Sequence, residues 1–228
     1  MEEVAMKYHS YFQVGLVLSA LSIMIAAPAQ AEQRYGLKSA LIEYNITGHI
    51  QGKETAYIDG FGEREARYSE YTLKLTGQEE PQKRYTLRKD DMLINVDLNR
   101  NLSVKFDLNK EIASGLDVHL TAKEMADYSA EGLKKMRAVH VGQESVAGKM
   151  CDLYELPFLS AKVWIYKQIA LRYVSNTRGF KVSYLATSIL EDIALGDDKF
   201  EVPEGIRSIG VAPENHLMGS VQPLPKDE

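Results

Sequence analysis

Cysteine is almost absent from this sequence, since only Cys151 occurs in 228 residues. A single cysteine excludes an intramolecular disulfide framework and a thiolate-rich metal site. It suits an exported protein, because an unpaired thiol is a hazard in an oxidising compartment. Cys151 lies in a strand-like run, and we interpret it as a small buried apolar side chain rather than a nucleophile.

Catalytic and metal-binding motifs are lacking as well. The histidines after residue 32 are widely spaced and form no ligand-like i, i+4 pair, which argues against zinc; they are His49, His119, His140 and His216. No Gly-x-Ser-x-Gly motif, phosphate-binding loop or dinucleotide fingerprint occurs. No acid–base or nucleophile constellation can be identified. We therefore expect no enzyme activity, no cofactor and no metal ion.

Positive charge is not in excess. The chain has 27 Lys and Arg residues against 32 Asp and Glu residues, for a formal net charge of −5. Nucleic-acid binding depends on clustered positive charge, so we expect no nucleic-acid partner. The hydrophobic content of 45% is ordinary for a globular protein, and the length allows one domain or at most two small ones.

Charged side chains are absent between Lys7 and Glu32. This gap holds an apolar run over residues 14–27, followed by the small-residue end Pro28-Ala-Gln-Ala31. A basic start, an apolar middle and small residues before a cleavage point are the layout of a secretory signal peptide. We predict a signal peptide over residues 1–31, cleaved after Ala31, and a periplasmic location. Translation from Met6 gives the cleaner basic start.

An uncleaved membrane helix is the rival interpretation, because the apolar run is near the lower limit for spanning a bilayer. Pro28 and the Ala29-x-Ala31 end favour cleavage. No cysteine directly follows the run, so we expect no lipid anchor there. After cleavage, we expect a protein that does not span the membrane.

Alternation of apolar and polar residues dominates from Leu37 to about Leu108, which predicts strands with one buried face. Ala40, Ile42, Tyr44 and Ile46 share one face of the first strand, and Tyr85 and Leu87 alternate with Arg84, Thr86 and Arg88 in a later one. Short turns are expected between the strands, so we predict an antiparallel meander. The predicted turns are Gly52-Lys53, Asp59-Gly60, Gly77–Pro81, Lys89–Asp91 and Asn99–Asn101.

The pattern then changes to one amphipathic helix, predicted over Ala122–Arg137. Thr121-Ala-Lys-Glu124 has the capping-box sequence at its start. Strands resume after Gly142, and we predict Lys149–Leu156, Val163–Ser175 and Phe180–Leu190, with a hairpin turn at residues 176–179. The chain beyond Ile206 has no periodic pattern, so we predict a β domain over residues 32–206 and a disordered tail over 207–228.

Four arginines form a possible basic surface on neighbouring strands: Arg64, Arg67, Arg84 and Arg88. Cation–π packing of Arg67 with Tyr68 and Tyr71 is feasible. The simpler interpretation is that these arginines occupy the exposed polar faces of amphipathic strands.

Three segments in the second half carry a resemblance. Val146-Ala-Gly-Lys-Met-Cys-Asp-Leu-Tyr154 precedes Lys162-Val-Trp-Ile-Tyr-Lys-Gln-Ile-Ala-Leu-Arg172, and Phe200-Glu-Val-Pro-Glu-Gly205 closes the domain. This order resembles the bacterial lipoprotein-localisation (LolA/LolB-like) superfamily, in which a G-K-x-C-x-x-Y strand precedes a W-I-x-K-x-x-x-L strand and F-x-x-P-x-G ends the sheet. The first half, at Tyr35–Ser39 and Glu54–Tyr68, is similar to a narrower group of uncharacterised envelope proteins.

The resemblance covers most of Tyr35–Ile206, and its motifs are structural rather than catalytic. It implies an α+β fold that is mainly antiparallel β: a curved incomplete barrel, or half-barrel, with one or more helices covering an apolar cavity. In lipoprotein carriers such a cavity takes acyl chains. Carriers begin with a helix before the first strand, whereas here only Glu32–Tyr35 precede the strand-like run.

Both sides of the strand around Trp164 are apolar, because Trp164 and Tyr166 alternate with Val163 and Ile165. A strand that is apolar on both faces is covered on both faces. A barrel interior that is not fully packed leaves a ligand cavity, whereas a packed one is simply a core, and both alternatives stay open. The candidate cavity residues are Ile42, Tyr44, Leu73, Ile94, Val104, Phe106, Met125, Leu133 and Trp164.

Two functional hypotheses follow. The first is an exported, non-enzymatic protein that binds an apolar ligand, such as a lipid or a lipoprotein acyl chain, or that supports envelope homeostasis. The second is a periplasmic protein-interaction or sensor domain with an envelope protein partner and no small-molecule ligand. Fold resemblance by itself does not decide between them.

Overall fold

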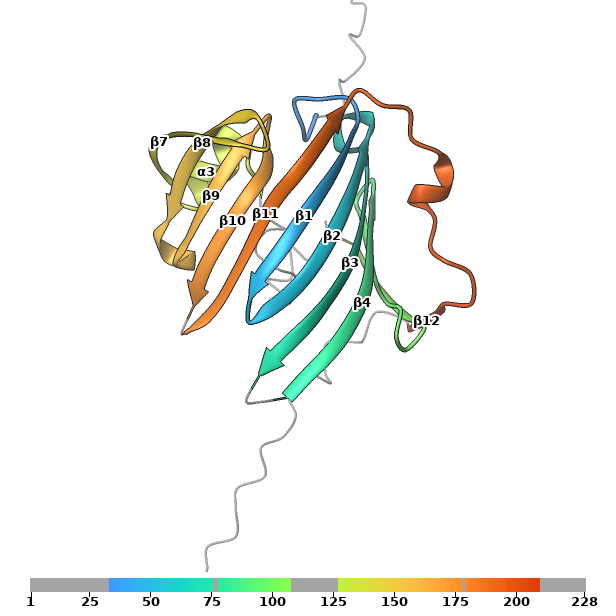
Figure 1. The fold of residues 1–228 in the computed structure, drawn as a ribbon. Coiled ribbons are helices and arrows are strands. Elements are labelled where there is room, and N and C mark those ends of the chain that lie inside the picture. Colours follow the sequence, from blue (N-terminus) through green and yellow to red (C-terminus); the bar gives the residue numbers. More distant parts are fainter. Residues whose placement is uncertain (1–32, 76–77, 108–126, 178, 210–228) are drawn as a thin grey trace, which may run out of the picture. The chain divides into compact units, whose positions relative to one another are not determined.

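The computed structural model describes residues 33–75, 78–107, 127–177 and 179–209. Twelve strands in this part of the chain form a single sheet, shown in Figure 1. They are β1 (Ala40–Gly48), β2 (Ile50–Asp59), β3 (Arg64–Leu75), β4 (Gln78–Lys89), β5 (Met92–Asp97), β6 (Leu102–Asp107), β7 (Val139–Val146), β8 (Lys149–Leu156), β9 (Ala161–Tyr166), β10 (Ile169–Thr177), β11 (Phe180–Glu191) and β12 (Arg207–Ile209). Short 3-10 turns lie at Gly60–Gly62, Pro157–Leu159 and Asp197–Phe200.

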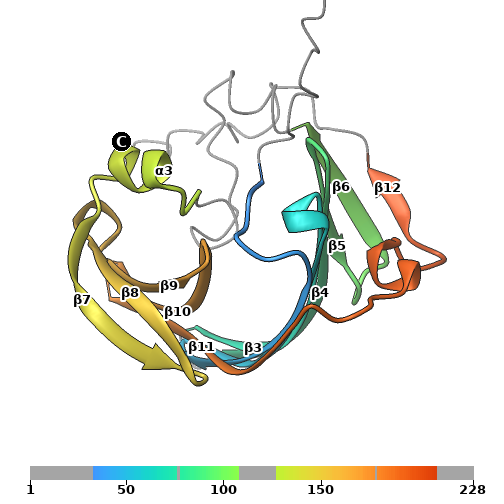
Figure 2. The ribbon, with the colours of Figure 1, turned by 90° about the horizontal axis from the view of Figure 1, so that it is seen from above.

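The sheet consists of two meanders that lie side by side. Its order is β12-β6-β5-β4-β3-β2-β1-β11-β10-β9-β8-β7, so the pairing of β11 with β1 joins the two halves. Every described pair is antiparallel except β12 with β6. The sheet curves strongly and does not close, because β7 and β12 are its two edges (Figure 2). The predicted fold class, a mainly antiparallel half-barrel with a covering helix, is confirmed.

Alternation along the first strands is confirmed. In β1, four apolar side chains are buried on one face, namely Ala40, Ile42, Tyr44 and Ile46. The predicted turns at residues 59–60, 89–91 and 99–101 fall between strands. The predicted turn at 77–81 is shorter than expected, because β4 already begins at Gln78.

The predicted turn at Gly52-Lys53 is wrong. Both residues lie within β2, and the chain reverses at Gly48-His49, where Gly48 has a φ of 111°. Gly52 has a different reason to be glycine: a Cβ atom there would lie 2.1 Å from the carbonyl oxygen of Glu70 on β3. A glycine inside a strand thus marks a close approach of two backbones rather than a reversal.

The single strand predicted over Val163–Ser175 is also wrong, because the chain reverses between β9 and β10 at Lys167 and Gln168. Both residues have positive φ, at 47° and 66°. A two-residue hairpin turn usually contains Gly, Asn or Asp, so its sequence signal is missing here. Tertiary contacts hold the turn: Lys167 Nζ lies 2.8 Å from Glu191 Oε2, and the Gly36 N–H donates to the Lys167 carbonyl oxygen.

The helix predicted over Ala122–Arg137 is shorter in the described residues. Helix α3 spans Ala130–Lys135, and the Ser129 hydroxyl caps it by accepting a hydrogen bond from the Gly132 N–H at 3.1 Å. Residues 108–126, including the predicted capping box, lie outside the described residues. The described part of the chain contains no helix long and apolar enough to cross a membrane.

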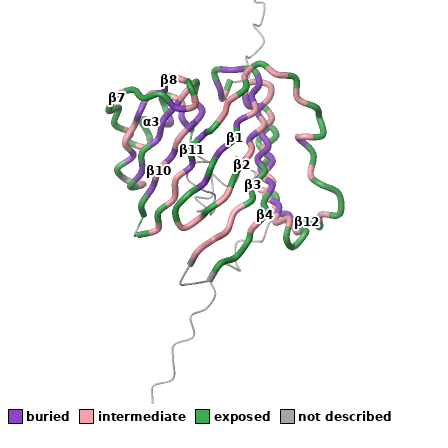
Figure 3. The backbone as a smooth tube through the Cα atoms, viewed as in Figure 1, coloured by how far each residue is buried: buried purple, intermediate pink, exposed green. Residues whose placement is uncertain are grey.

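The main hydrophobic cluster packs on the inner, concave side of the curved sheet, and Figure 3 shows burial concentrated in the middle strands. Strands β1, β2 and β8 to β11 all contribute side chains to this cluster, and the segment around α3 adds Tyr128 and Leu133. Members from the strands include Ile42, Tyr44, Ile46, Ala56, Ile58, Val163, Leu171, Tyr173 and Tyr184.

A second cluster, the outer cluster, lies on the convex side of β3, β4 and β5. It consists of Ala66, Tyr85, Leu87, Val96 and Phe200. Phe200 comes from the strap, residues 192–206, which leaves β11 and runs outside these strands (Figure 2).

Two polar contacts fasten the strap to the sheet. Arg64 Nη1 lies 2.6 Å from Asp197 Oδ1, and the Tyr85 hydroxyl donates to the Lys199 carbonyl oxygen at 2.8 Å. The strap leads into β12, whose residues Arg207–Ile209 lie just beyond Ile206. Residues 1–31 and 210–228, which include the predicted signal peptide and most of the predicted tail, lie outside the described residues.

Candidate functional site

The inner face of the sheet changes from apolar to polar between β1 and β5. One cross-strand row shows the change, because register places Tyr44, Glu54, Ser69, Arg84 and Asp97 next to one another on consecutive strands. In β4 the apolar face packs in the outer cluster, so alternation turns the polar face inward. The strap therefore leaves the first half of the sheet with a polar concave surface.

Glu54 belongs to a buried charge cluster on this face, defined as Arg34, Glu54, Glu65 and Arg67. Arg67 is its centre and is only 6% exposed. Arg67 Nη1 lies 2.7 Å from Glu54 Oε1, and Arg67 Nη2 lies 2.6 Å from Glu65 Oε1. Arg34 Nη1 lies 2.6 Å from Glu65 Oε2. Each carboxylate is thus paired with at least one guanidinium.

Neutral side chains complete the hydrogen bonding of the cluster. The Tyr35 hydroxyl donates to Glu65 Oε2 at 2.7 Å, and the Ser69 hydroxyl donates to Glu54 Oε2 at 3.0 Å. Buried ion pairs are retained only when such additional bonds satisfy the remaining lone pairs. Arg34 and Tyr35 precede β1, so the cluster fastens the start of the domain to β2 and β3.

The electrostatics of the cluster keep it ionised. Burial alone would raise the pKa of Glu65, but the Arg67 and Arg34 guanidiniums and the hydrogen bonds from Tyr35 and Arg67 lower that pKa to about 2. Burial alone would lower the pKa of Arg67, yet Glu65 and Glu54 raise it well above its ordinary value. A carboxylate held this far from neutrality is a poor general acid near pH 7.

One hydroxyl next to this cluster is unsatisfied. The Tyr128 hydroxyl is buried and has no hydrogen-bond partner among the described residues. Burial raises the pKa of Tyr128, with Tyr173 adding to the shift and Arg67 opposing it. Tyr128 therefore places a polar group over the inner surface without fixing its direction by a bond.

Acid is expected to destabilise the fold through Glu65. Its pKa is about 2 in the folded protein against an ordinary 4.5, so its stabilising contribution is complete above pH 4.5 and is lost as the pH falls to 2. For this buried group, the loss amounts to about 3 kcal/mol. Urea unfolding followed by circular dichroism across this range measures it, with Glu65→Gln as control. Equal pH slopes in the two proteins would contradict the assignment.

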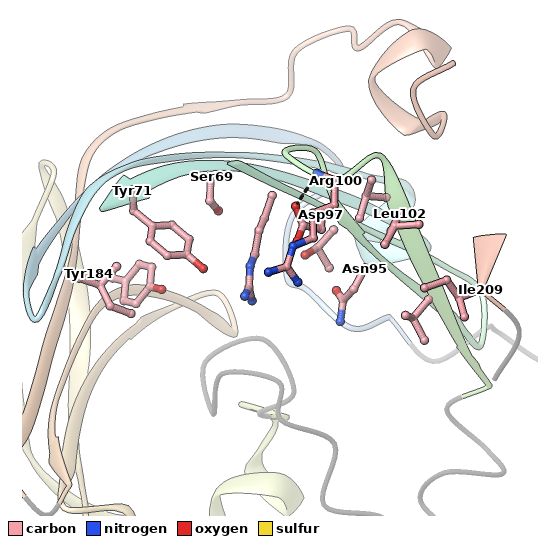
Figure 4. A pocket seen from close by; sticks show the side chains of 13 residues that line it. Ser69, Tyr71, Asn95, Asp97, Arg100, Leu102, Tyr184 and Ile209 are labelled. Carbon is pink, nitrogen blue, oxygen red and sulfur yellow. Dashed lines mark hydrogen bonds and ion pairs between the residues drawn. The ribbon is translucent and has the colours of Figure 1, made fainter. Parts of the chain in front are cut away.

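A groove of about 290 Å³ opens on the inner face beside the buried charge cluster (Figure 4). Tyr71 and Tyr184 lie at one end, and Leu102 and Ile209 at the other. Polar side chains occupy the middle. The lining residues are Ile50, Ser69, Tyr71, Arg84, Thr86, Asn95, Val96, Asp97, Arg100, Leu102, Val104, Tyr184 and Ile209.

The sequence-predicted cavity residues are divided among several places. Val104 lines the groove. Ile42, Tyr44 and Leu133 are packed in the main cluster, and register places Leu73 and Phe106 on the inner face outside the groove lining. Ile94 packs against the outer cluster, and Met125 lies outside the described residues. Whether any of them contacts a ligand remains a prediction.

Trp164 is buried, at 5% exposed, and belongs to the main hydrophobic cluster. It pairs in register with Arg172, whose guanidinium carbon is 4.2 Å from the centroid of the indole ring. The indole N–H donates to Glu144 Oε2 at 2.8 Å. Polar groups thus contact an indole ring that is buried in a strand whose sequence is apolar on both faces.

The four arginines that the sequence predicted as a possible basic surface identify part of the site. Arg67, Arg84 and Arg88 share the inner face, whereas Arg64 lies on the outer face with Asp59 and Asp197. The expected stacking of Arg67 on tyrosine is replaced by its ion pairs, and Arg84 is the arginine near Tyr71, with its guanidinium carbon 5.9 Å from the ring centroid. The exposed-face interpretation is wrong for Arg67, because the curved sheet buries it.

The sequence reasoning did not identify Arg34, Glu54 and Glu65 as site residues. Glu54 and Glu65 have the spacing of the ordinary polar side of a strand, and only their shared face with Arg67 distinguishes them. Arg34 precedes β1 and belongs to no strand. In the described residues, no group of three or more His, Cys, Asp or Glu side chains is arranged to hold a metal ion.

Comparison with known proteins gives distant likenesses of fold. No family model and no curated protein matches the chain. An uncharacterised conserved protein from Thermus thermophilus aligns with a TM-score of 0.48 and 10% identity, over 76% of this chain and 90% of that one. MucB aligns with a TM-score of 0.42 and 11% identity, over 76% of this chain and 60% of MucB.

The complex of MucA and MucB from Pseudomonas aeruginosa contains a similar chain, with a TM-score of 0.41, 11% identity and coverage of 76% of this chain and 59% of that one. This protein thus spans about three fifths of the length of the MucB chains that it matches. Likenesses this distant do not support a conclusion about family or function.

Proposed function

We propose that this protein is an exported periplasmic protein that binds an amphiphile, such as a lipid or a lipoprotein acyl chain, in the groove on its inner face, and that it catalyses no reaction. The observation that carries the proposal is the groove itself, which has apolar ends and a polar middle on the concave side of a half-barrel. The signal-peptide pattern of residues 1–31 supports the location.

The groove has the physical character of a small-ligand site. Its volume of about 290 Å³ lies just below the usual range for such sites, which begins near 300 Å³. Tyr71, Tyr184, Val104 and Leu102 offer apolar surface, and each methylene buried there contributes about 0.8 kcal/mol. An acyl chain is the simplest occupant that uses this surface.

The charged groups near the groove favour binding over catalysis. Glu54 and Glu65 are both held in ion pairs with Arg67, and the pKa of Glu65 is lowered to about 2. Asp97 is engaged as well, because its Oδ1 accepts hydrogen bonds from the backbone N–H groups of Asn99 and Arg100. A non-enzymatic role fits carboxylates that are all occupied structurally.

Filling the groove is expected to abolish ligand binding. Val104→Trp places a large ring among the lining residues, and we expect affinity for a radiolabelled C12 to C16 fatty acid to fall by at least about tenfold, roughly 1.4 kcal/mol. Leu185→Trp is the matched control, because Leu185 is 42% exposed on the outer face. Native mass spectrometry of protein purified from the periplasm reports any ligand carried from the cell.

A second variant guards against misfolding of the first. Ile50→Asn makes the opposite end of the groove polar with little change in volume, and circular dichroism checks the fold of each variant. The proposal would be contradicted if the natural protein carried no bound lipid and acyl ligands did not raise its melting temperature. That outcome would favour the protein-interaction alternative.

A further inference from the structure

The inner face holds more positive than negative charge. Within the buried charge cluster, two arginines balance two glutamates. Outside it, the inner face and groove carry Arg84, Arg88 and Arg100 against Asp97 alone, among the residues that line the groove and the small hollow next to it. Such an excess on a concave surface attracts anions.

Arg84 lies opposite a carboxylate on the next strand but is not ion-paired with it. Register places Asp97 directly opposite Arg84 on β5, yet the two side chains form no ion pair. The Asp97 carboxylate instead accepts hydrogen bonds from the Asn99 and Arg100 N–H groups, at 3.0 and 3.1 Å. Its contact with Arg100 Nε is long, at 3.7 Å. The turn between β5 and β6 thus occupies the carboxylate, and no carboxylate of the described residues is ion-paired with Arg84.

Arg88 is a second arginine on this face of β4, and it is more buried than Arg84. It lies on the same face of β4 as Arg84, four residues along, with Thr86 between them. Arg88 is half-buried beside Arg34 and Glu65, and no carboxylate of the described residues is ion-paired with it. Burial lowers the pKa of Arg88, and the neighbouring Arg34 lowers it further. Positive charge is therefore in excess on the inner face of β4 over residues 84–88.

The surroundings of Arg84 determine what kind of anion fits. Its guanidinium lies near the Tyr71 ring, and Ser69, Thr86 and Asn95 add hydroxyl and amide groups around it. Apolar side chains flank this polar middle on both sides, as Figure 4 shows for Tyr184 and Leu102. A guanidinium binds a phosphate or carboxylate through two parallel hydrogen bonds, which suits an oxyanion placed between the apolar ends.

We propose that the groove selects amphiphiles with a negatively charged oxyanion head group, which Arg84 binds while the apolar chain lies against Tyr71, Tyr184 and Val104. This inference rests on the proposed function and adds the chemical class of the ligand. The head group meets Arg84 in the polar middle of the groove, and the chain covers the apolar surface beside it. A neutral or cationic amphiphile of the same chain length lacks the first of these interactions.

A charge series with one chain length tests the selection. The probes are dodecyl phosphate, the neutral monododecanoyl glycerol, dodecyltrimethylammonium and inorganic phosphate, each titrated below micelle formation by isothermal calorimetry. We expect dodecyl phosphate to bind at least about tenfold more tightly than the neutral and cationic probes. Its affinity is expected to fall as salt is added, because screening weakens charge contacts.

Variants of the exposed Arg84 side chain distinguish loss of the head-group contact from loss of the fold. Arg84→Gln is expected to weaken dodecyl phosphate about tenfold and to leave the neutral probe unchanged, and Arg84→Glu is expected to reverse the preference towards dodecyltrimethylammonium. Lys53→Gln removes an exposed cation from the outer face of β2 and is the matched control.

The outcomes distinguish the two proposals. Equal binding of all three dodecyl probes, unaffected by Arg84→Gln, overturns the charge selection and leaves amphiphile binding intact. Inorganic phosphate binding as tightly as dodecyl phosphate shows that the apolar chain contributes nothing, which overturns the amphiphile assignment. Binding of no dodecyl probe overturns both.

Discussion

Replacing Arg67 with methionine is expected to lower the free energy of unfolding by about 3–5 kcal/mol at neutral pH, because Glu54 and Glu65 would remain buried without their shared cation. Urea denaturation followed by circular dichroism measures the loss. The deficit relative to the natural protein should shrink in acid, because protonation of the two carboxylates removes the uncompensated charge.

Two further proteins make this result interpretable. The triple variant Glu54→Gln/Glu65→Gln/Arg67→Met keeps the shapes but removes the charges, so it should regain part of the lost stability. Lys53→Met removes an exposed cation and should change stability by less than about 0.5 kcal/mol. A loss below about 1 kcal/mol for Arg67→Met would show that the cluster is hydrated and not a determinant of the fold.

Phe200→Ala is expected to cost about 3–5 kcal/mol, the usual range for removing a buried aromatic ring. Phe200 is 5% exposed, packs against Ala66, Tyr85 and Leu87, and has the Arg64 guanidinium carbon 4.5 Å from its ring centroid. The ring anchors the strap to the sheet, so its removal should also expose residues 192–206 to limited proteolysis.

The control for Phe200 is another phenylalanine in a less buried place. Phe180 begins β11 and contacts the His49 ring, with the centroids 5.1 Å apart. Phe180→Ala should cost less than half as much, because its side chain is only partly buried. Equal losses for the two variants would contradict the view that the outer cluster stabilises the first half of the sheet.

Local patterns in the sequence predicted most of the fold. Alternation in β1 correctly identified Ile42, Tyr44 and Ile46 as one buried face, and it correctly grouped Tyr85 with Leu87 in β4. Polar turn residues located the connections at Lys89–Asp91 and Asn99–Asn101. These features depend on neighbours in sequence, which is why they could be predicted without a structure.

The failures have a common cause in contacts between distant residues. Gly52 resembles a turn residue, but it is glycine because β3 passes too close for a Cβ atom. Lys167 and Gln168 resemble strand residues, but contacts with Gly36 and Glu191 hold them in a tight turn. Neither the close approach nor the supporting contacts are encoded within a few residues of the site.

The candidate site was predicted less well than the fold, and Arg84 illustrates the reason. Its alternation with Tyr85 correctly places the two side chains on opposite faces of β4. It does not state which face is concave, since either face of an isolated strand can be the buried one. The most natural assumption, that the apolar face points inward, fails for β4, where Tyr85 packs outward under the strap.

The sequence by itself determined which residues share a strand face, where most turns lie and that the chain builds a mainly antiparallel sheet, because a period of two follows from strand geometry alone. Only the tertiary structure decided which face became the interior. The pairing of β11 with β1 curves the two meanders into one half-barrel, and the strap covers the convex side of β3 to β5. The apolar side chains of those strands are thereby buried under the strap on the convex side. Arg67, Arg84 and Glu65 therefore line the concave surface.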